Sequence, residues 1–176
     1  MSTKVVTGLV RFSYAHVFEP QSMEGSDTKK YSASLIIPKS DKVTLKKVED
    51  AIAEALELGK TGKFGGKIPA NYKNPLRDGD LDRPDDEAYI DSMFINANSL
   101  QAPQVVDASV NPILDREEFY SGCYGRASVT FYAYNSNGSK GIAAGLQNVQ
   151  KLKDGEKLSG GSSAAEDFGD MEESLV

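Results

Sequence analysis

The stretch FYSGCYGRASVTFYAYN, residues 119–135, places aromatic and cationic side chains on one face of a predicted strand. Successive side chains of a strand point to opposite sides, so residues two apart share a face. The aromatic and cationic side chains of this face are Tyr124, Arg126, Tyr132 and Tyr134. Phenol rings stack on unpaired bases of any identity, at about 1–3 kcal/mol per base, and a guanidinium binds phosphate. We therefore expect this face to bind single strands, although rings packed against cross-strand neighbours are the structural alternative.

A second set of cations lies in predicted loops and beside strand ends. The segment GKTGKFGGKIPANYKNPLR, residues 59–77, interleaves four lysines and one arginine with two aromatic rings. We predict that it is a flexible basic arm that follows a phosphate backbone, with an ordinary solvated loop as the alternative. Its glycine and lysine spacing does not match a nucleoside-triphosphate loop. The predicted DNA-binding residues outside the tyrosine face are Lys29, Lys30, Lys63, Lys67, Tyr72, Lys73, Arg77 and Lys140.

An acidic segment, residues 77–87, raises the possibility of metal chemistry. Its carboxylates are Asp78, Asp80, Asp82, Asp85, Asp86 and Glu87. The first three have the spacing of a calcium loop, but Arg83 and Tyr89 occupy the positions that require glycine and glutamate. We predict a solvated loop, no metal, no cofactor and no catalytic residue, and a metal-dependent DNA enzyme that uses residues 78–87 stays open as an alternative.

The net charge of −6 over 176 residues is distributed unevenly. Residues 159–176 contribute −5, so the rest of the chain, with 20 basic and 21 acidic groups, is nearly neutral. The local field, not the net charge, steers a polyanion. We find no signal peptide and no apolar run of the roughly 20 residues that a membrane span needs, and expect a cytoplasmic protein.

Hydrophobic periodicity predicts a mostly β domain with one amphipathic helix. The predicted strands are residues 4–14, 31–38, 93–99, 103–107, 124–134 and 140–152. The helix is predicted over residues 41–58, with Ser40 or Asp41 as its N-cap and Gly59 ending it in the left-handed conformation. NSNG at 135–138 predicts a hairpin turn.

The connections between these elements are predicted from composition. Gly8 suggests a bulge in the first strand, 21–30 a polar loop, and 59–92 a long, charged connection. An OB-fold-like Greek-key barrel over residues 1–153 fits this count of strands, with a β-sandwich as the alternative. Residues 154–176 are predicted to be a flexible acidic tail.

The tail combines acidic and apolar residues. Those predicted to bind partners are Glu166, Asp167, Phe168, Asp170, Glu172 and Glu173. A charged strand of this kind mimics a nucleic-acid backbone, and its apolar residues suit a pocket rimmed by cations. The tail is thus expected to compete with DNA and to recruit proteins, with a purely solubilising end as the alternative.

These residues resemble a family of tailed-phage and prophage single-stranded DNA-binding proteins that was long known only as a domain of unknown function. The most specific part is FYSGCYGRASVTFYAYN with KGIAAGLQNVQKLKDGEKLSGG, which starts at Lys140, followed by an acidic end. LRDGD at 76–80 and FINANS at 94–99 also look like this family. The tail departs from the ending of many single-strand binders, because its aromatic residue, Phe168, is internal.

The resemblance implies an OB-fold protein that coats single-stranded DNA during phage replication or recombination, with a tail that recruits replication or recombination proteins. The strand residues that it suggests are Tyr120, Tyr124, Arg126, Tyr132 and Tyr134. We expect no catalysis, weaker binding to duplex DNA and no membrane association. A homodimer and a phage protein–protein interaction module both stay open.

Overall fold

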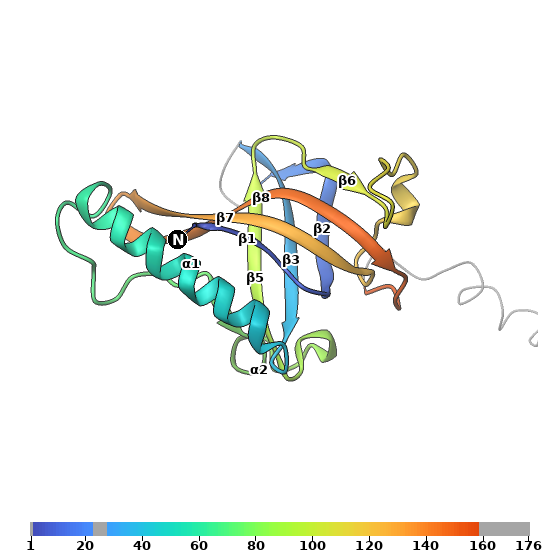
Figure 1. Cartoon of the computed structure of the whole chain (residues 1–176), viewed down its shortest axis with the longest axis horizontal. Helices are drawn as coiled ribbons and strands as arrows, with labels where there is room; N and C mark the ends of the chain where they lie inside the picture. Colours follow the sequence, from blue (N-terminus) through green and yellow to red (C-terminus); the bar gives the residue numbers. More distant parts are fainter. Residues whose placement is uncertain (1, 23–27, 159–176) are drawn as a thin grey trace, which may run out of the picture.

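The computed structural model describes residues 2–22 and 28–158, and it is mostly β with one long helix, as predicted (Figure 1). The strands are β1 (Lys4–Val6), β2 (Val10–Ser22), β3 (Lys29–Pro38), β4 (Leu76–Asp78), β5 (Ser92–Ser99), β6 (Gln104–Val106), β7 (Tyr124–Ser136) and β8 (Ser139–Lys153). The helical elements are α1 (Lys42–Thr61), α2 (Gly79–Asp82), and the 3₁₀ turns η1 (Glu87–Tyr89) and η2 (Arg116–Glu118). In the described part of the chain no helix is long and apolar enough to cross a membrane.

Five strands close into a barrel. The ring runs β7, β2, β3, β5, β8 and returns to β7 through the long β7–β8 pairing. All of these pairings are antiparallel except that of β5 with β8, where Ala97 lies opposite Ala144. Closure pairs strand edges that an open sheet would leave exposed. The predicted OB-like barrel is therefore the architecture observed.

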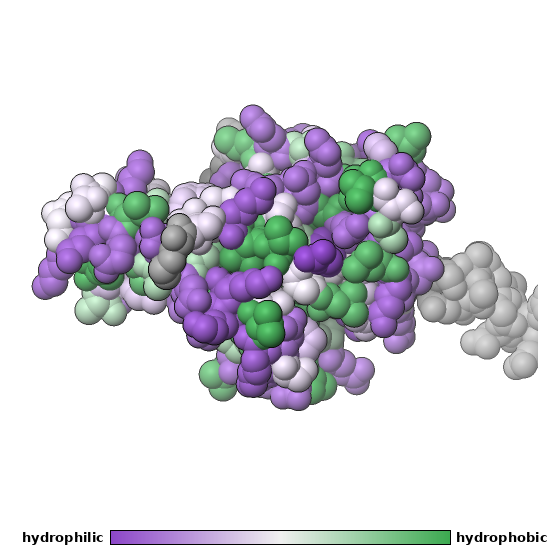
Figure 2. All heavy atoms as spheres, in the orientation of Figure 1, coloured by the Kyte–Doolittle hydropathy of each residue, from purple (hydrophilic) through white to green (hydrophobic). Residues whose placement is uncertain are grey.

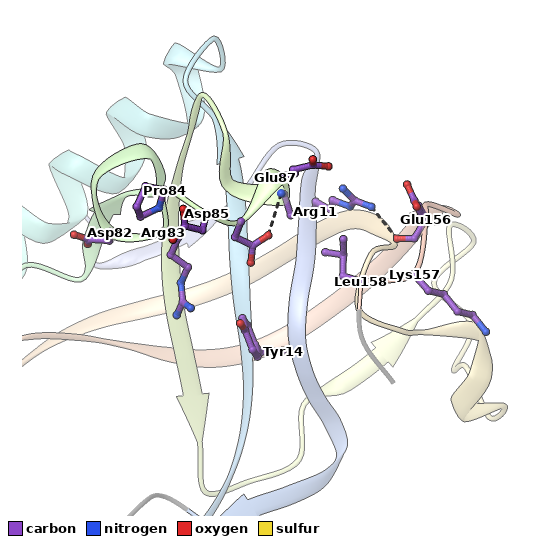
Figure 3. A pocket seen from close by; sticks show the side chains of 12 residues that line it. Arg11, Tyr14, Asp82, Arg83, Pro84, Asp85, Glu87, Glu156, Lys157 and Leu158 are labelled. Carbon is purple, nitrogen blue, oxygen red and sulfur yellow. Dashed lines mark hydrogen bonds between the residues drawn. The ribbon is translucent and has the colours of Figure 1, made fainter. Parts of the chain in front are cut away.

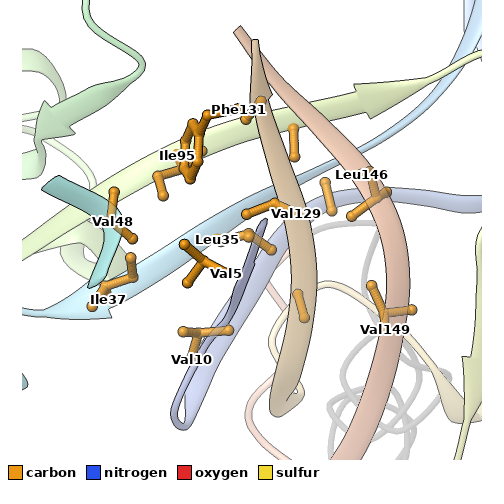
Figure 4. Close-up of a cluster of buried hydrophobic side chains, with 14 of the residues drawn as sticks. Val5, Val10, Leu35, Ile37, Val48, Ile95, Val129, Phe131, Leu146 and Val149 are labelled. Carbon is orange, nitrogen blue, oxygen red and sulfur yellow. The ribbon is translucent and has the colours of Figure 1, made fainter. Parts of the chain in front are cut away.

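The interior of the barrel is filled by alternate side chains of its strands. Leu35, Ile95, Val129 and Phe131 are almost fully buried there, and Figure 4 shows them with neighbours from β2 and β8. Ala127, Val129 and Phe131, which alternate with the aromatic and cationic side chains along β7, form its core face. The side chains of Tyr132 and Tyr134, on the opposite face of β7, point outward.

A tight turn joins β7 to β8. Only Asn137 and Gly138 separate the strands, and both have positive φ angles, 51° and 84°. Two successive positive φ angles are typical of a type I′ turn, which matches the twist of a hairpin and favours Asn-Gly. The predicted hairpin is confirmed.

Helix α1 begins as predicted but ends later. The carboxylate of Asp41 accepts a hydrogen bond from the Thr44 amide at 3.1 Å, which satisfies a free donor of the first turn. The predicted end at Gly59 is wrong, because the helix continues to Thr61 and its C-cap is Gly62. Gly59 is instead a packing position: a Cβ there would lie 2.5 Å from the Cβ of Ala133. The helix runs from the end of β3 toward the tip of the β7–β8 hairpin (Figure 1).

Two predictions near the N-terminus are also wrong. Residues 4–14 are not one strand, because β1 ends at Val6 and β2 begins at Val10. Between them the Gly8 amide donates to Thr44 Oγ1 at 3.0 Å. Gly8 therefore contacts α1 and does not form a bulge. Residues 21–30 are not simply a loop, because β2 continues to Ser22 and β3 begins at Lys29.

The predicted long, charged connection 59–92 packs in part onto the outer face of β3 and β5. Tyr89 is fully buried against Ile36 and Phe94, and its hydroxyl donates to Ser34 Oγ at 2.9 Å. The Lys39 ammonium lies 3.0 Å from Asp78 and 2.8 Å from Asp80. A small second core and an ion-pair cluster thus hold the acidic segment in place.

Candidate nucleic-acid interface

A groove of about 460 Å³, which we call the basic groove, lies on the outer side of β5, β8 and the end of β7. Its charged lining residues are Lys30, Lys73 and Arg77, all of which are basic. Tyr132 and Tyr134 line it as well. The structure therefore brings together five of the predicted DNA-binding side chains from three segments of the chain, β3, residues 59–77 and β7.

Strand β8 contributes Ile142, Ala143 and Ala144 to the lining of the basic groove. Tyr132 lies opposite Ala143, and Tyr134 lies opposite Gly141. Because these partners have little or no side chain, the tyrosine rings have no bulky neighbour on that strand, and Tyr132 is 45% exposed. Its ring is therefore accessible for stacking.

One wall of the basic groove comes from the predicted basic arm, which is not a free loop. The Lys73 amide donates to the Lys140 carbonyl at 3.0 Å, and the Ile142 amide donates to the Lys73 carbonyl at 3.0 Å. Gly141 is required at this contact, since a Cβ there would lie 2.7 Å from the Lys73 Cβ. The wall is thus bonded to β8.

The remainder of the predicted arm lies elsewhere. Phe64 is buried, and Lys63 and Lys67 are exposed but do not line the basic groove. Tyr72 is half-buried against the core, and Lys140 contributes its carbonyl to the bond with Lys73. Lys29 is exposed at the start of β3, opposite Ser22. These residues stay predictions for DNA binding.

A second pocket of about 500 Å³ adjoins the basic groove, with Tyr132 common to both. Its polar lining residues are Ser99, Gln101, Gln104, Thr130, Gln147 and Asn148. We call it the amide pocket, because four of these six side chains are amides. No described residue in its lining is charged.

The other end of β7 forms a separate cluster of tyrosines and cations. Arg11 and Lys153 lie over the Tyr124 ring, at 5.3 and 4.8 Å from its centroid, a geometry typical of cation–π contacts. Tyr124 is eight residues from Tyr132, about 26 Å along a strand. The predicted tyrosine face is therefore not one continuous surface.

Tyr120 belongs to this second cluster and is held by the segment that follows β8. Its hydroxyl donates to Asp154 at 2.9 Å and accepts from the Gly155 amide at 3.1 Å. Burial raises the pKa of the Tyr120 phenol. Arg126 lies between the two tyrosine groups and donates from Nε to the Thr7 carbonyl at 2.9 Å.

The acidic segment is largely paired. Arg77 Nε lies 2.6 Å from Asp82, so this arginine is shared between the basic groove and a carboxylate. The Lys39 ammonium, with the Asp91 amide, lowers the pKa of Asp80. Within the described residues no three His, Cys, Asp or Glu side chains lie together as a metal site.

A pocket of about 760 Å³ beside the acidic segment was not anticipated from the sequence (Figure 3). It is lined in part by Arg83, whose guanidinium lies 5.2 Å from the ring centroids of Tyr14 and Tyr89. The carboxylates in its lining are Asp82, Asp85, Asp86, Glu87 and Glu156, against the cations Arg11, Arg83 and Lys157. This excess of negative charge disfavours phosphate, so it is a poor candidate for the DNA site.

Other features of the surface do not add to the site. Cys123 is buried, which raises the pKa of its thiol and makes it a poor nucleophile. Figure 2 shows one face of the molecule, where hydrophilic side chains predominate and hydrophobic ones form separate patches. The predicted tail residues Glu166 to Glu173 lie outside the described residues.

Sequence reasoning missed the amides that line both pockets. Asn96 and Asn98 lie in the basic groove, and they alternate along β5 with the buried Ile95 and Ala97. That alternation is visible in FINANS, residues 94–99, and could have placed both amides on the outer face.

Comparison with known proteins gives a consistent result along most of the chain. The family model described as "Enterobacter phage Enc34, ssDNA-binding protein" matches residues 3–175. A relative, "Putative protein p50" of Acyrthosiphon pisum secondary endosymbiont phage 1, is 34% identical over an alignment of 179 residues. The alignment covers 96% of this chain and 94% of that protein.

Solved structures share this fold over most of the chain. The single-stranded DNA-binding protein of bacteriophage Enc34 in complex with ssDNA matches with a TM-score of 0.77 and 28% identity, covering 89% of this chain and 90% of that chain. Gp2.5 of bacteriophage T7, a single-stranded DNA-binding protein, shares the fold, with a TM-score of 0.60 and 16% identity over 97% of this chain and 94% of that one.

Proposed function

The chain belongs to the Enc34 phage single-stranded DNA-binding protein family, and on this premise we propose that it binds single-stranded DNA in the basic groove. Bases stack on Tyr132 and Tyr134, and Lys30 and Lys73 bind phosphates. The observation that carries this proposal is that Tyr132 and Tyr134 line the same groove as Lys30, Lys73 and Arg77, with no acidic residue among the described residues of its lining.

The chemistry of the groove favours unpaired strands. A stacked duplex hides its base faces, so a ring in the groove gains only from bases that are exposed. The lysines bind the backbone without reading sequence. Binding is therefore sequence-tolerant and weaker for duplex DNA, and the protein coats single strands during phage replication or recombination.

A direct test is a binding titration with a thirty-base thymine oligomer and with a matched duplex. The proposal expects a clear preference for the single strand, and an affinity whose logarithm falls by about 0.7 per log unit of salt for each neutralised phosphate. Equal binding of both DNAs would remove the stacking argument. Cleavage of labelled strands in Mg²⁺, lost in Asp80→Asn, would instead support the enzymatic alternative.

The acidic tail is proposed to compete with DNA for the basic groove and to recruit replication or recombination proteins. Residues 159–176 contribute −5 charges, and such a chain is attracted to the same lysines as a phosphate backbone. Deleting them should raise affinity for the thymine oligomer at low salt. The gain should shrink at high salt, where screening weakens both interactions. A truncated protein that binds no better would remove the tail as a competitor.

A further inference from the structure

The amide pocket differs from the basic groove in one property that matters for nucleic acids. Both pockets share Tyr132, but the groove contains three cations and the amide pocket, among the residues described, contains none. Phosphate binding depends on positive charge, whereas contacts with base edges depend on hydrogen-bond donors and acceptors. The two sides of Tyr132 therefore suit different parts of a nucleotide.

The amide pocket has hydrogen-bonding groups to spare. Within the described chain the side-chain amides of Gln101 and Gln104 have no hydrogen-bond partner. Gln147 uses only its Nε2, which donates to Thr130 Oγ1 at 2.6 Å. Asn148 uses only its Oδ1, which accepts from the Gln104 backbone amide at 3.2 Å. Free donors and acceptors thus remain in the pocket that Tyr132 also lines.

We propose that the amide pocket is a subsite for the edge of an unpaired nucleobase, adjacent to the base that stacks on Tyr132. This inference rests on the proposed function. Each amide offers a donor and an acceptor, the combination that a base edge presents in return. In duplex DNA the Watson–Crick edges are already paired, so the pocket adds a second reason for single-strand preference.

The geometry around Tyr132 keeps the subsite open. On β8, Gly145 lies opposite Thr130 and lines the amide pocket. A Cβ at this glycine would lie 3.6 Å from Tyr132 Cε1, so any larger side chain would project beside the ring. Gly145 therefore leaves space at the position where a base next to the stacked one would lie.

The test uses two strands of equal length and charge, a thymine oligomer and the same oligomer with abasic sites at alternate positions. The double variant Gln104→Ala/Gln147→Ala removes two amides from the pocket and no charge. It should bind the thymine oligomer about fivefold or more weakly than the wild type. It should bind the abasic oligomer nearly as well as the wild type does, with an unchanged salt dependence. Asn111→Ala, which removes an exposed amide elsewhere, is the matched control and should change neither affinity.

The outcomes separate the possible failures. An equal loss of affinity for both oligomers would mean that the amides contact the backbone, and no loss for either would mean that DNA does not enter the pocket; both overturn the inference. A wild type that does not bind the thymine oligomer would instead overturn the proposed function. Circular dichroism checks folding; if the double variant unfolds, Gln101→Ala and Gln104→Ala, which lie outside the β7–β8 hairpin, repeat the comparison with the same expectation.

Discussion

Replacing Tyr132 with alanine tests the stacking argument at the residue on which both pockets depend. The ring is 45% exposed, and its neighbours on β8 are Ala143 and Gly145. Stacking of a base on an aromatic ring contributes about 1–3 kcal/mol. The variant should therefore bind a thymine oligomer about 5- to 150-fold more weakly.

The measurement is a fluorescence anisotropy titration at fixed salt, with Tyr132→Phe as the matched control. Phenylalanine keeps the ring and loses only the hydroxyl, so it should bind nearly as well as the wild type. Because the ring is already partly exposed, we expect a loss in unfolding free energy of about 1–2 kcal/mol for Tyr132→Ala, and urea unfolding checks it.

Two results would refute the reasoning. Affinity that is unchanged in the alanine variant would mean that no base stacks on Tyr132. A loss in Tyr132→Phe as large as that in the alanine variant would mean that the hydroxyl, not the ring, makes the contact. A salt dependence that stays constant in both variants would agree with a contact that neutralises no phosphate.

Three further predictions concern charge, packing and pH. The double variant Lys30→Ala/Lys73→Ala should reduce the slope of log affinity against log salt by about 1.4, which a titration at several salt concentrations measures; an unchanged slope would place the phosphates elsewhere. Gly59→Ala should destabilise the protein by about 1–3 kcal/mol in urea unfolding, because its methyl would lie 2.5 Å from a side chain of β7; stabilisation, the usual effect of this change in a helix, would contradict the packing described. Lys39 lowers the pKa of Asp80, so this pair stabilises the fold above the unfolded pKa of about 3.9 and loses its effect as pH falls through the lower folded value. Lys39→Met should therefore be less stable than the wild type at pH 7, with a smaller difference near pH 3; a difference independent of pH would contradict the ion pair.

Much of the fold was predictable because local signals agreed with the tertiary structure. The alternation in β7, the Asn-Gly turn and the apolar stripe of α1 each follow from the periodicity of a single element. The end of α1 was not predictable in this way, because the glycine at position 59 indicated that the helix ends there. At Gly59 the packing of Phe64 and Ala133 outweighs that preference.

Pairing between distant strands was not predictable from local signals. The parallel contact of β5 with β8 joins residues almost fifty positions apart, and it brings Asn98 opposite Gly145. This contact brings the amides of β5 onto the same outer surface as the tyrosines of β7. The sequence therefore indicated the chemistry of the site through Tyr132 and Lys73, but not which of its residues share one groove.

The same limit applies to the separation of the tyrosines. Their shared face on β7 suggested one surface, but the length of the strand places Tyr124 at the far end, under Arg11 and Lys153. Residues 154–158, predicted to be the start of a flexible tail, supply contacts to this end. The boundary at residue 153 stays a prediction, because it rests on composition alone.

Those contacts decide where the chain should be cut when its acidic end is removed. Asp154 and Gly155 bond the hydroxyl of Tyr120, Glu156 accepts from Arg11, and Leu158 donates to the Ser121 carbonyl. A stop codon after residue 153 would remove these contacts together with the negative charge of residues 159–176. A change in DNA affinity could then come either from lost folding or from lost charge. A stop codon after residue 158 leaves these contacts in place and isolates the electrostatic effect.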